Sequence, residues 1–204
     1  NRVESAAAHA KYLRATIHFG DFTITPGLRH ESISFKRYDY GSSDLERLAE
    51  GNYRINNVSV LLPGFGLNYQ VSRSIDVFTG VHRGFIPPGS NPETDPELSI
   101  NSELGLRFSH RSVSAQLVIF SNNYSNLLGA DLNASGGTGS GDLFNGGSAM
   151  ANGLEFELAV DPFTDGPFDH ISMPVRIAYT YTDATFTNAF SSDFGAWGDV
   201  EEGD

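Results

Sequence analysis

Apolar and polar residues alternate along much of this chain, and the clearest example is the segment 12–35. From Leu13 to Phe19 every second residue is apolar, and the alternation resumes after a short break at Gly20 and Asp21. A period of two residues is typical of β-strands, and a two-residue break containing Gly and Asp is typical of a tight hairpin turn. The segment is therefore predicted to form two antiparallel strands.

The same alternation recurs further along the chain, and the whole pattern predicts about eight strands of roughly 9–11 residues. The later segments are 61–71, 75–85, 99–108, 112–122, 152–160 and 171–183. A strand of this length crosses a bilayer when it is tilted by about 45°. Three prolines fall inside the predicted strands, at Pro26, Pro63 and Pro174, and each removes a hydrogen-bond donor, so we expect local bulges there.

The connections between the predicted strands alternate in length. Tight turns are expected at Gly20, Arg73 and Arg111, and a medium turn is expected after Asp161. Long polar loops are expected at the opposite ends of the strands. They comprise residues 36–56, 86–98, 123–150 and 183 onward. Short turns at one end and long loops at the other are typical of an outer-membrane β-barrel, whereas a Greek-key sandwich has no reason to sort its loops in this way.

Composition favours the barrel and excludes other classes. The chain has 204 residues with 15 Phe, 8 Tyr and 22 Gly, and only 19% of the residues are charged. The absence of cysteine excludes a disulfide framework, a thiol nucleophile and a Cys-ligated zinc site. The net charge of -12 argues against sequence-independent binding of nucleic acid, which needs a basic stripe. Lys11 and Lys36 are the only lysines, although a soluble acidic domain usually carries many on its wet face.

No group of residues indicates catalysis, a metal or a cofactor. The six histidines are scattered, and no Ser-His-Asp arrangement stands out. Glu155 and Glu157 share one face and could form an acid–base pair, but a solvated pair explains them more simply. The glycine-rich run 136–142 has neither the spacing of a calcium-binding repeat nor the flanking strand and helix of a nucleotide loop. We expect no enzymatic activity, no cofactor and no metal.

Three segments carry a resemblance to a known family: FGDFTITPGLRHESISF (19–35), LLPGFGLNYQVSRSIDVFTGVHRGFIPPG (61–89) and PELSINSELGLRF (96–108). They resemble the barrel of TonB-dependent outer-membrane receptors, above all the ferric-dicitrate-receptor type. The most specific parts are the VFTGVHRGFIPP and ELSINSELGLR runs. The weaker NGLEFELAV and IAYTYTDATF segments follow in the right order.

The resemblance implies an all-β, antiparallel up-and-down transmembrane β-barrel of about 22 strands, closed inside by an N-terminal plug. Such a receptor lies in the outer membrane of a Gram-negative bacterium and takes up a ferric chelate with energy from the TonB complex. Residues 1–204 would be about eight strands of that barrel, with the plug domain and the closing strands absent. The implied partners are a ferric chelate (a siderophore or a ferric-citrate-like ligand), outer-membrane lipid, the receptor's own plug domain and the TonB complex, and no nucleic acid.

Two alternatives stay open at this point. One is a small closed eight-stranded outer-membrane barrel with a structural or adhesive role. The other is a soluble secreted β-sandwich that binds carbohydrate.

In the barrel interpretation the two faces of the first hairpin have opposite surroundings. The side chains expected to face lipid are Leu13, Ile17, Phe19, Phe22, Ile24 and Leu28. Those expected to face the interior are Arg14, Thr23, Thr25, Arg29 and Glu31. A soluble sheet would reverse this arrangement.

A ferric chelate of the citrate type is anionic, so its site would need fixed positive charge. Counting residues up from the tight turns, at about 3.3 Å each, places Arg29, His82 and Arg83 in the half of the barrel near the long loops. Alternation allows only one of His82 and Arg83 to point inward, and Arg29 could instead form a wall salt bridge with Glu31. With contributions from the loops, the candidate ligand-binding residues are Arg29, His82, Arg83, Arg47, Arg54 and Asn133.

Overall fold

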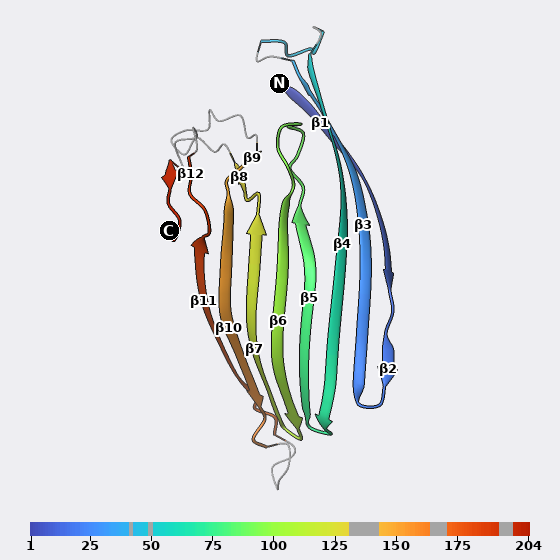
Figure 1. Ribbon diagram of the computed structural model, residues 1–204, viewed down its shortest axis with the longest axis vertical. Helices are drawn as coiled ribbons and strands as arrows, with labels where there is room; N and C mark the ends of the chain where they lie inside the picture. Colours follow the sequence, from blue (N-terminus) through green and yellow to red (C-terminus); the bar gives the residue numbers. More distant parts are fainter. Residues whose placement is uncertain (41–42, 49–50, 131–142, 164–170, 192–197) are drawn as a thin grey trace.

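The computed structural model describes residues 1–40, 43–48, 51–130, 143–163, 171–191 and 198–204. Its main feature is one long antiparallel sheet in which each strand pairs with its neighbours along the chain (Figure 1). The strands in spatial order are β1 (Arg2–Arg14), β3 (Phe22–Asp39), β4 (Asn52–Ser72), β5 (Ile75–Ile86), β6 (Glu97–His110), β7 (Val113–Ser125), β10 (Ser148–Val160) and β11 (Val175–Phe186). The short strand β2 (Ile17–Phe19) also pairs with β3.

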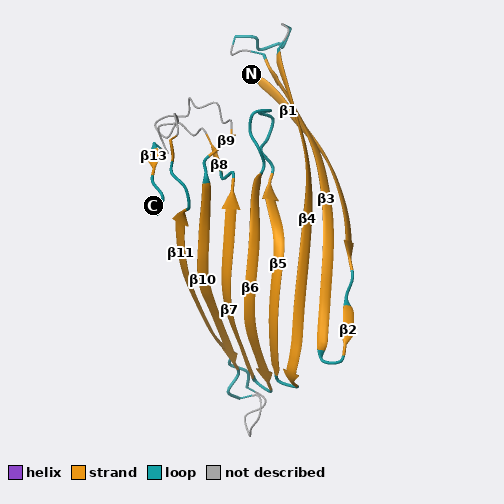
Figure 2. Ribbon diagram, viewed as in Figure 1, coloured by secondary structure: helices purple, strands orange, loops and turns teal. Residues whose placement is uncertain are grey.

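This order confirms the predicted up-and-down meander. β1 and β11 are the two edges of the sheet, so the described strands form an open wall and not a closed eight-stranded barrel. Two small hairpins lie at the long-loop end: β8 (Leu128–Ala130) pairs with β9 (Leu143–Asn145), and β12 (Phe190–Ser191) pairs with β13 (Asp199–Val200). Strands and connecting loops make up the described ranges in Figure 2, and none of these ranges contains a helix long and apolar enough to cross a membrane.

The three tight turns lie together at one end, which we call the lower end as it is drawn in Figure 1. β2 and β3 are joined through Gly20, whose φ is 58°, and β6 and β7 are joined through Arg111, whose φ is 52°. β4 and β5 are joined through Arg73 and Ser74, where the Ser74 amide donates to Ser72 Oγ at 3.2 Å. The long connections lie at the upper end, so the predicted sorting of loops is confirmed.

The fourth lower connection, between β10 and β11, is organised by Asp161. Its carboxylate accepts hydrogen bonds from the Ser172 hydroxyl at 2.6 Å and from the amides of Phe163 and Met173 at 3.2 and 3.3 Å. The bond from Ser172 is the main reason that the pKa of Asp161 lies below its ordinary value of 3.8, and the two amides lower it further.

Two predicted features at the upper end are wrong. The loop expected at 36–56 is shorter than predicted, because β3 has 18 residues and runs to Asp39, and β4 has 21 residues and begins at Asn52. Residues 2–11, for which the pattern predicted no strand, belong to β1. A strand of 18 residues spans about 59 Å, roughly twice the 30 Å of a bilayer core. The upper parts of these strands therefore extend beyond the bilayer core, and the outward apolar residues by which a lipid-facing strand is recognised become rare there.

The three prolines have three different positions. Pro26 stays in register in β3, and its carbonyl accepts a hydrogen bond from the Ala15 amide at 3.1 Å. Because proline has no N–H, it cannot donate a bond to the neighbouring strand, and the gap between β1 and β2 lies opposite it. Pro63 follows the last β4–β5 pair, Gly64 with His82, so the ladder ends where the donor is missing. The expected bulges are thus interruptions of pairing. Pro174 was expected inside a strand, but it lies just before β11.

The two faces of the sheet differ as expected for a wall between lipid and water. We call the face that carries Leu28, Phe65 and Leu104 the outer face, and these side chains are 46%, 45% and 48% exposed. Other exposed members are Leu13, Phe22, Leu61, Tyr69, Val81, Ile100, Leu106, Leu117, Ile119, Ile177, Tyr179 and Tyr181. Phe22 and Tyr69 stack at 4.5 Å near the lower end, where outer-membrane barrels carry an aromatic girdle.

The opposite face, which we call the inner face, holds most of the charged residues and several buried ones. Glu31, Ile33, Val58 and Val118 are each less than 9% exposed. In its lower part the Phe78 ring lies over Gly105, where a Cβ atom would collide with it, and the Arg107 guanidinium lies 4.9 Å from the centre of this ring. The absence of a side chain at Gly105 therefore makes room for an aromatic ring on the inner face.

Candidate functional site

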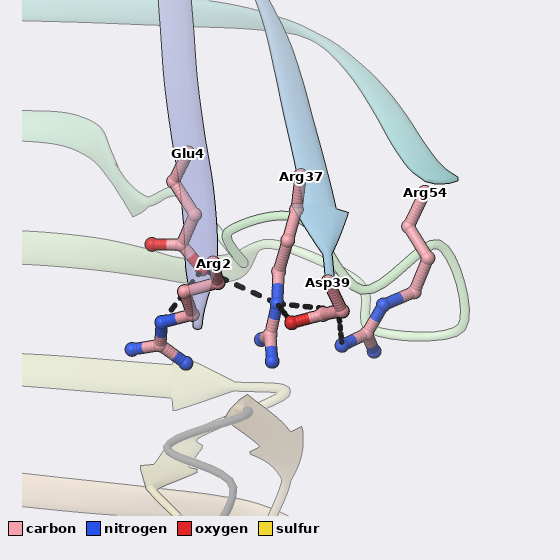
Figure 3. Close-up of polar contacts among 5 residues, drawn as sticks. All are labelled: Arg2, Glu4, Arg37, Asp39 and Arg54. Carbon is pink, nitrogen blue, oxygen red and sulfur yellow. Dashed lines mark hydrogen bonds and ion pairs between the residues drawn. The ribbon is translucent and has the colours of Figure 1, made fainter. Parts of the chain in front are cut away.

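The upper part of the inner face carries a cluster of charged residues from three adjacent strands. Register pairing places Glu4 of β1, Arg37 of β3 and Arg54 of β4 in one row, and Asp39 lies one step higher beside Arg2. Since side chains alternate along a strand, all five point to the same side of the sheet, as Figure 3 shows. The cluster is therefore a direct product of strand register.

Asp39 is the centre of this charged cluster. Arg37 Nε donates to its carboxylate at 2.9 Å, and Arg54 Nη2 does so at 3.2 Å (Figure 3). Arg37 Nε also lies 3.5 Å from Glu4 Oε1, and Arg2 Nε lies 3.7 Å from the same oxygen. The Arg37 side chain is only 8% exposed, so its charge is held in place. Three guanidinium groups and two carboxylates thus form one fixed basic cluster.

The loop between β5 and β6, residues 87–96, folds over this part of the wall. Asn56 on the inner face of β4 holds it, because its Nδ2 donates to the carbonyls of Gly89 at 3.1 Å and Asn91 at 2.9 Å. Pro88, which belongs to this loop, is fully buried. Between the loop and the wall lies a pocket of about 490 Å³ lined by Arg2, Glu4, Phe35, Arg37 and residues 88–91, among others. Its size is in the range of small-molecule sites.

The same loop is joined to the β8–β9 hairpin. Asn145 exchanges hydrogen bonds with Asp95, accepting from its amide at 2.8 Å and donating to its carbonyl at 2.9 Å, and Thr94 Oγ1 donates to the Leu143 carbonyl at 2.7 Å. Glu97, which is 8% exposed, accepts from the Leu128 amide at 2.9 Å. These bonds tie two upper connections together over the inner face.

Two of the predicted ligand-binding residues lie at this upper end. Arg54 belongs to the charged cluster, although it was expected in a loop and lies in β4. Arg47 lies in the connection between β3 and β4, where its Nε donates to Asn1 Oδ1 at 3.1 Å and its guanidinium faces the Tyr40 ring at 5.9 Å.

Arg29 and His82 lie lower on the inner face. Arg29 is bound to Glu31, with its Nε donating to Oε1 at 2.6 Å, so the wall salt bridge considered from the sequence is present. Eight residues of β3 separate Arg29 from Arg37, a distance of about 26 Å. His82 Nε2 lies 3.3 Å from Asn101 Nδ2 and borders an inner pocket of about 350 Å³ with Glu103 and Glu155.

The remaining candidates fall elsewhere. Arg83 follows His82 in β5 and therefore points to the outer face, beside Ile100 and near Asn123. Asn133 and the glycine-rich run 136–142 lie outside the described residues. The structure thus places Arg47 and Arg54 at the upper end and Arg29 and His82 lower on the inner face. The fifth described candidate, Arg83, points to the outer face.

Sequence reasoning missed Arg2, Glu4, Arg37 and Asp39. The available signal was a pair of charged residues two positions apart, as in Arg37–Asp39 and Arg2–Glu4. Residues two positions apart on a strand point to the same face of the sheet. It was overlooked because the alternation of apolar residues ends below these positions. In the part of the chain that the structure describes, no three His, Asp or Glu side chains come together as a possible metal site.

Comparison with known families agrees with this architecture. Residues 1–200 match the model of the family described as "TonB dependent receptor-like, beta-barrel". The chain belongs to this family of TonB-dependent receptor barrels.

Solved structures with the same fold come from iron and siderophore receptors. The ferric citrate transporter FecA in its unliganded form matches with a TM-score of 0.69 and 22% identity, over 90% of this chain and 27% of that one. The siderophore receptor PiuA from Acinetobacter baumannii matches with a TM-score of 0.71 and 15% identity, over 98% and 29%. The ferric yersiniabactin uptake receptor FyuA from Yersinia pestis matches with a TM-score of 0.62 and 20% identity, over 95% and 33%. This chain thus spans about a third of such receptors or less, and the likeness concerns the fold.

Proposed function

We propose that this chain is part of the barrel wall of an outer-membrane receptor that takes up an anionic ferric chelate in a Gram-negative bacterium. The proposal extends to a ligand of the ferric-citrate type, a plug domain inside the barrel and energy from the TonB complex. The observation that carries it is the basic cluster at the upper, long-loop end of the inner face. The iron and siderophore receptors that share the fold support it.

The cluster has the properties that capture of an anion requires. Arginine presents a planar fork that binds carboxylate oxygens in pairs, and it keeps its charge at all physiological pH values. Arg37 and Arg54 are already oriented by Asp39, so little side-chain freedom would be lost on binding. The pocket beside Arg2 and Arg37 lies under the loop 87–96, which a ligand arriving from the upper end would meet first.

Binding to the full-length receptor tests this proposal. Ferric citrate is the anionic probe, and a neutral ferric trihydroxamate of similar size is the comparison. Arg54→Gln is expected to weaken binding of ferric citrate about tenfold, the effect of losing one charge-assisted hydrogen bond, and to change binding of the neutral probe much less.

The matched control is Arg176→Gln, which removes an inner-face arginine from the lower end of β11, where it pairs with Glu157 at 3.2 Å. This control is expected to bind ferric citrate as the unchanged receptor does. A full-length receptor that binds and transports neither probe would refute the function, whereas equal effects of the two substitutions would refute only the position of the site.

A further inference from the structure

The acidic chain has an outer face that is almost free of acid. Although the net charge is -12, no outward position of β1 or of β3 to β7, all of which the structure describes, holds Asp or Glu. The outward basic residues of these strands are His9, Lys11, His30, Lys36, Arg83 and His110. Both lysines of the chain are among them. The positive charge of the outer face therefore has no carboxylate on the same face of these strands to neutralise it.

Arg83 lies in the middle of an apolar groove on this face. The groove has a volume of about 610 Å³, and its outward side chains are Pro63, Phe65, Val81, Arg83, Leu98, Ile100, Asn123 and Ser125. It follows from the end of the β4–β5 ladder: above Gly64 and His82 the two strands no longer pair, and they diverge in Figure 1. The separation leaves room that side chains of adjacent paired strands would otherwise fill.

The surroundings of Arg83 call for an anion from outside the protein. Among the described residues none forms an ion pair or hydrogen bond with its side chain. Arg83 pairs with Ile100, with Asn123 one strand further, and Pro63 lines the same groove. A guanidinium group among lipid-facing apolar side chains is costly unless it is paired, and the phosphate of a membrane lipid is the anion present at this surface.

We propose that the groove around Arg83 binds an anionic phospholipid, with the lipid phosphate on the guanidinium and one acyl chain along Phe65, Val81 and Ile100. The amide of Asn123 lies at the rim, where it can donate to a second polar group of the lipid. This site lies on the opposite side of the wall from the charged cluster, and it does not depend on which ligand the receptor carries.

The experiment counts lipids bound to the full-length receptor by native mass spectrometry, after purification in mild detergent. The probes are dimyristoyl phosphatidylglycerol, dimyristoyl phosphatidylcholine with the same acyl chains, and inorganic phosphate. The unchanged receptor is expected to retain phosphatidylglycerol in preference to phosphatidylcholine. Arg83→Gln is expected to lower the affinity for phosphatidylglycerol about tenfold, to the level of phosphatidylcholine.

Two further variants separate charge from shape. Ile100→Trp fills the groove without changing the charge and is expected to weaken the binding of both lipids. Arg73→Gln removes an arginine from a lower turn and is expected to change neither. Heat-modifiable migration in gels verifies that each variant is folded, and if Arg83→Gln does not fold, Ile100→Trp decides the matter.

Three outcomes would overturn the proposal: equal retention of both lipids by the unchanged receptor, unchanged retention in Arg83→Gln or in Ile100→Trp, or full displacement of phosphatidylglycerol by inorganic phosphate. The last outcome would show a site for free phosphate rather than for a lipid.

Discussion

The outer and inner faces of the sheet are made by the same strands, but apolar side chains are exposed on the outer face and buried on the inner face. On β7, outward Leu117 is 41% exposed and Ile119 is 49% exposed, while Val118 between them is 6% exposed. The outer face keeps large apolar side chains without a protein partner, whereas the inner face combines polar groups with a few tightly packed ones. The difference shows that the solvent on each side, lipid or water, decides which residue a strand position tolerates.

The contrast between the faces is confined to the lower part of the wall. Above it, the outer face carries His30, Ser32 and Ser34 in place of aliphatic residues, while the inner face carries the charged cluster. The upper strands thus combine the charged cluster with a few buried apolar side chains such as Ile33 and Val58, and hydrogen bonds and ion pairs help to hold them together there. Substitutions at adjacent positions of one strand test both parts of this comparison.

The largest effect is expected where charge is placed on the lipid side. Leu67→Arg on the outer face of β4 should lower the free energy of unfolding by about 2–4 kcal/mol if it lies near the bilayer midplane. Asn68→Arg at the next position should cost far less, because Asn68 faces inward and already bonds to Asp76 at 3.2 Å, so an arginine there meets a carboxylate. Guanidinium unfolding of the full-length receptor in phospholipid vesicles measures both. Equal losses would show that the faces are not distinct.

A smaller effect is expected in the upper part. Arg37→Met should lower the free energy of unfolding by about 1–3 kcal/mol, because Asp39 and Glu4 lose a charge-assisted hydrogen-bond donor. Lys36→Met is the control on the same strand: Lys36 points outward and is exposed, and its loss should cost less than about 0.5 kcal/mol. Unfolding in the same vesicles gives the two values. A cost at Lys36 as large as that at Arg37 would contradict the claim that ion pairs on the inner face hold the upper strands.

The smallest effect concerns packing within the inner face. Gly105→Ala should cost about 1 kcal/mol, because the added Cβ displaces the Phe78 ring, the end of a side chain that can partly adjust. Gly66→Ala, also inward, should be neutral or slightly stabilising, because its nearest neighbour, Thr25 Cβ, is at an ordinary contact distance of 3.8 Å. The shift of the thermal transition in detergent compares the two variants. A neutral Gly105→Ala would show that the ring is not seated on the glycine.

Much of the wall could be predicted from the sequence, because the bilayer imposes a simple pattern on it. Outward Leu104 and Leu106 alternate with inward Glu103, Gly105 and Arg107, and the turns at Gly20 and Arg111 need only two residues each. Both signals are local, and the structure confirms them.

The upper end could not be predicted in the same way. Strand β1 is rich in alanine and has no apolar face, and the ends of β3 and β4 around residues 36–39 and 52–57 are mostly polar, so the sequence there resembles a loop. The charged cluster depends on register between three strands, since Arg37 meets Glu4 and Arg54 only after pairing is known. The link between Asn56 and the loop 87–96 joins residues 33 and 35 positions apart, and no local pattern encodes it.

The central claim is that one face of this wall contacts lipid and the other does not, and spin labelling along β7 tests it most directly. The chain contains no cysteine, so single cysteines can be placed at each position from 114 to 121 of a full-length receptor free of other cysteines. Collision with oxygen, which concentrates in the bilayer, should rise and fall with a period of two, with maxima at odd positions such as 117 and 119. Maxima at even positions would reverse the faces, and the absence of a period would contradict a lipid-facing strand altogether.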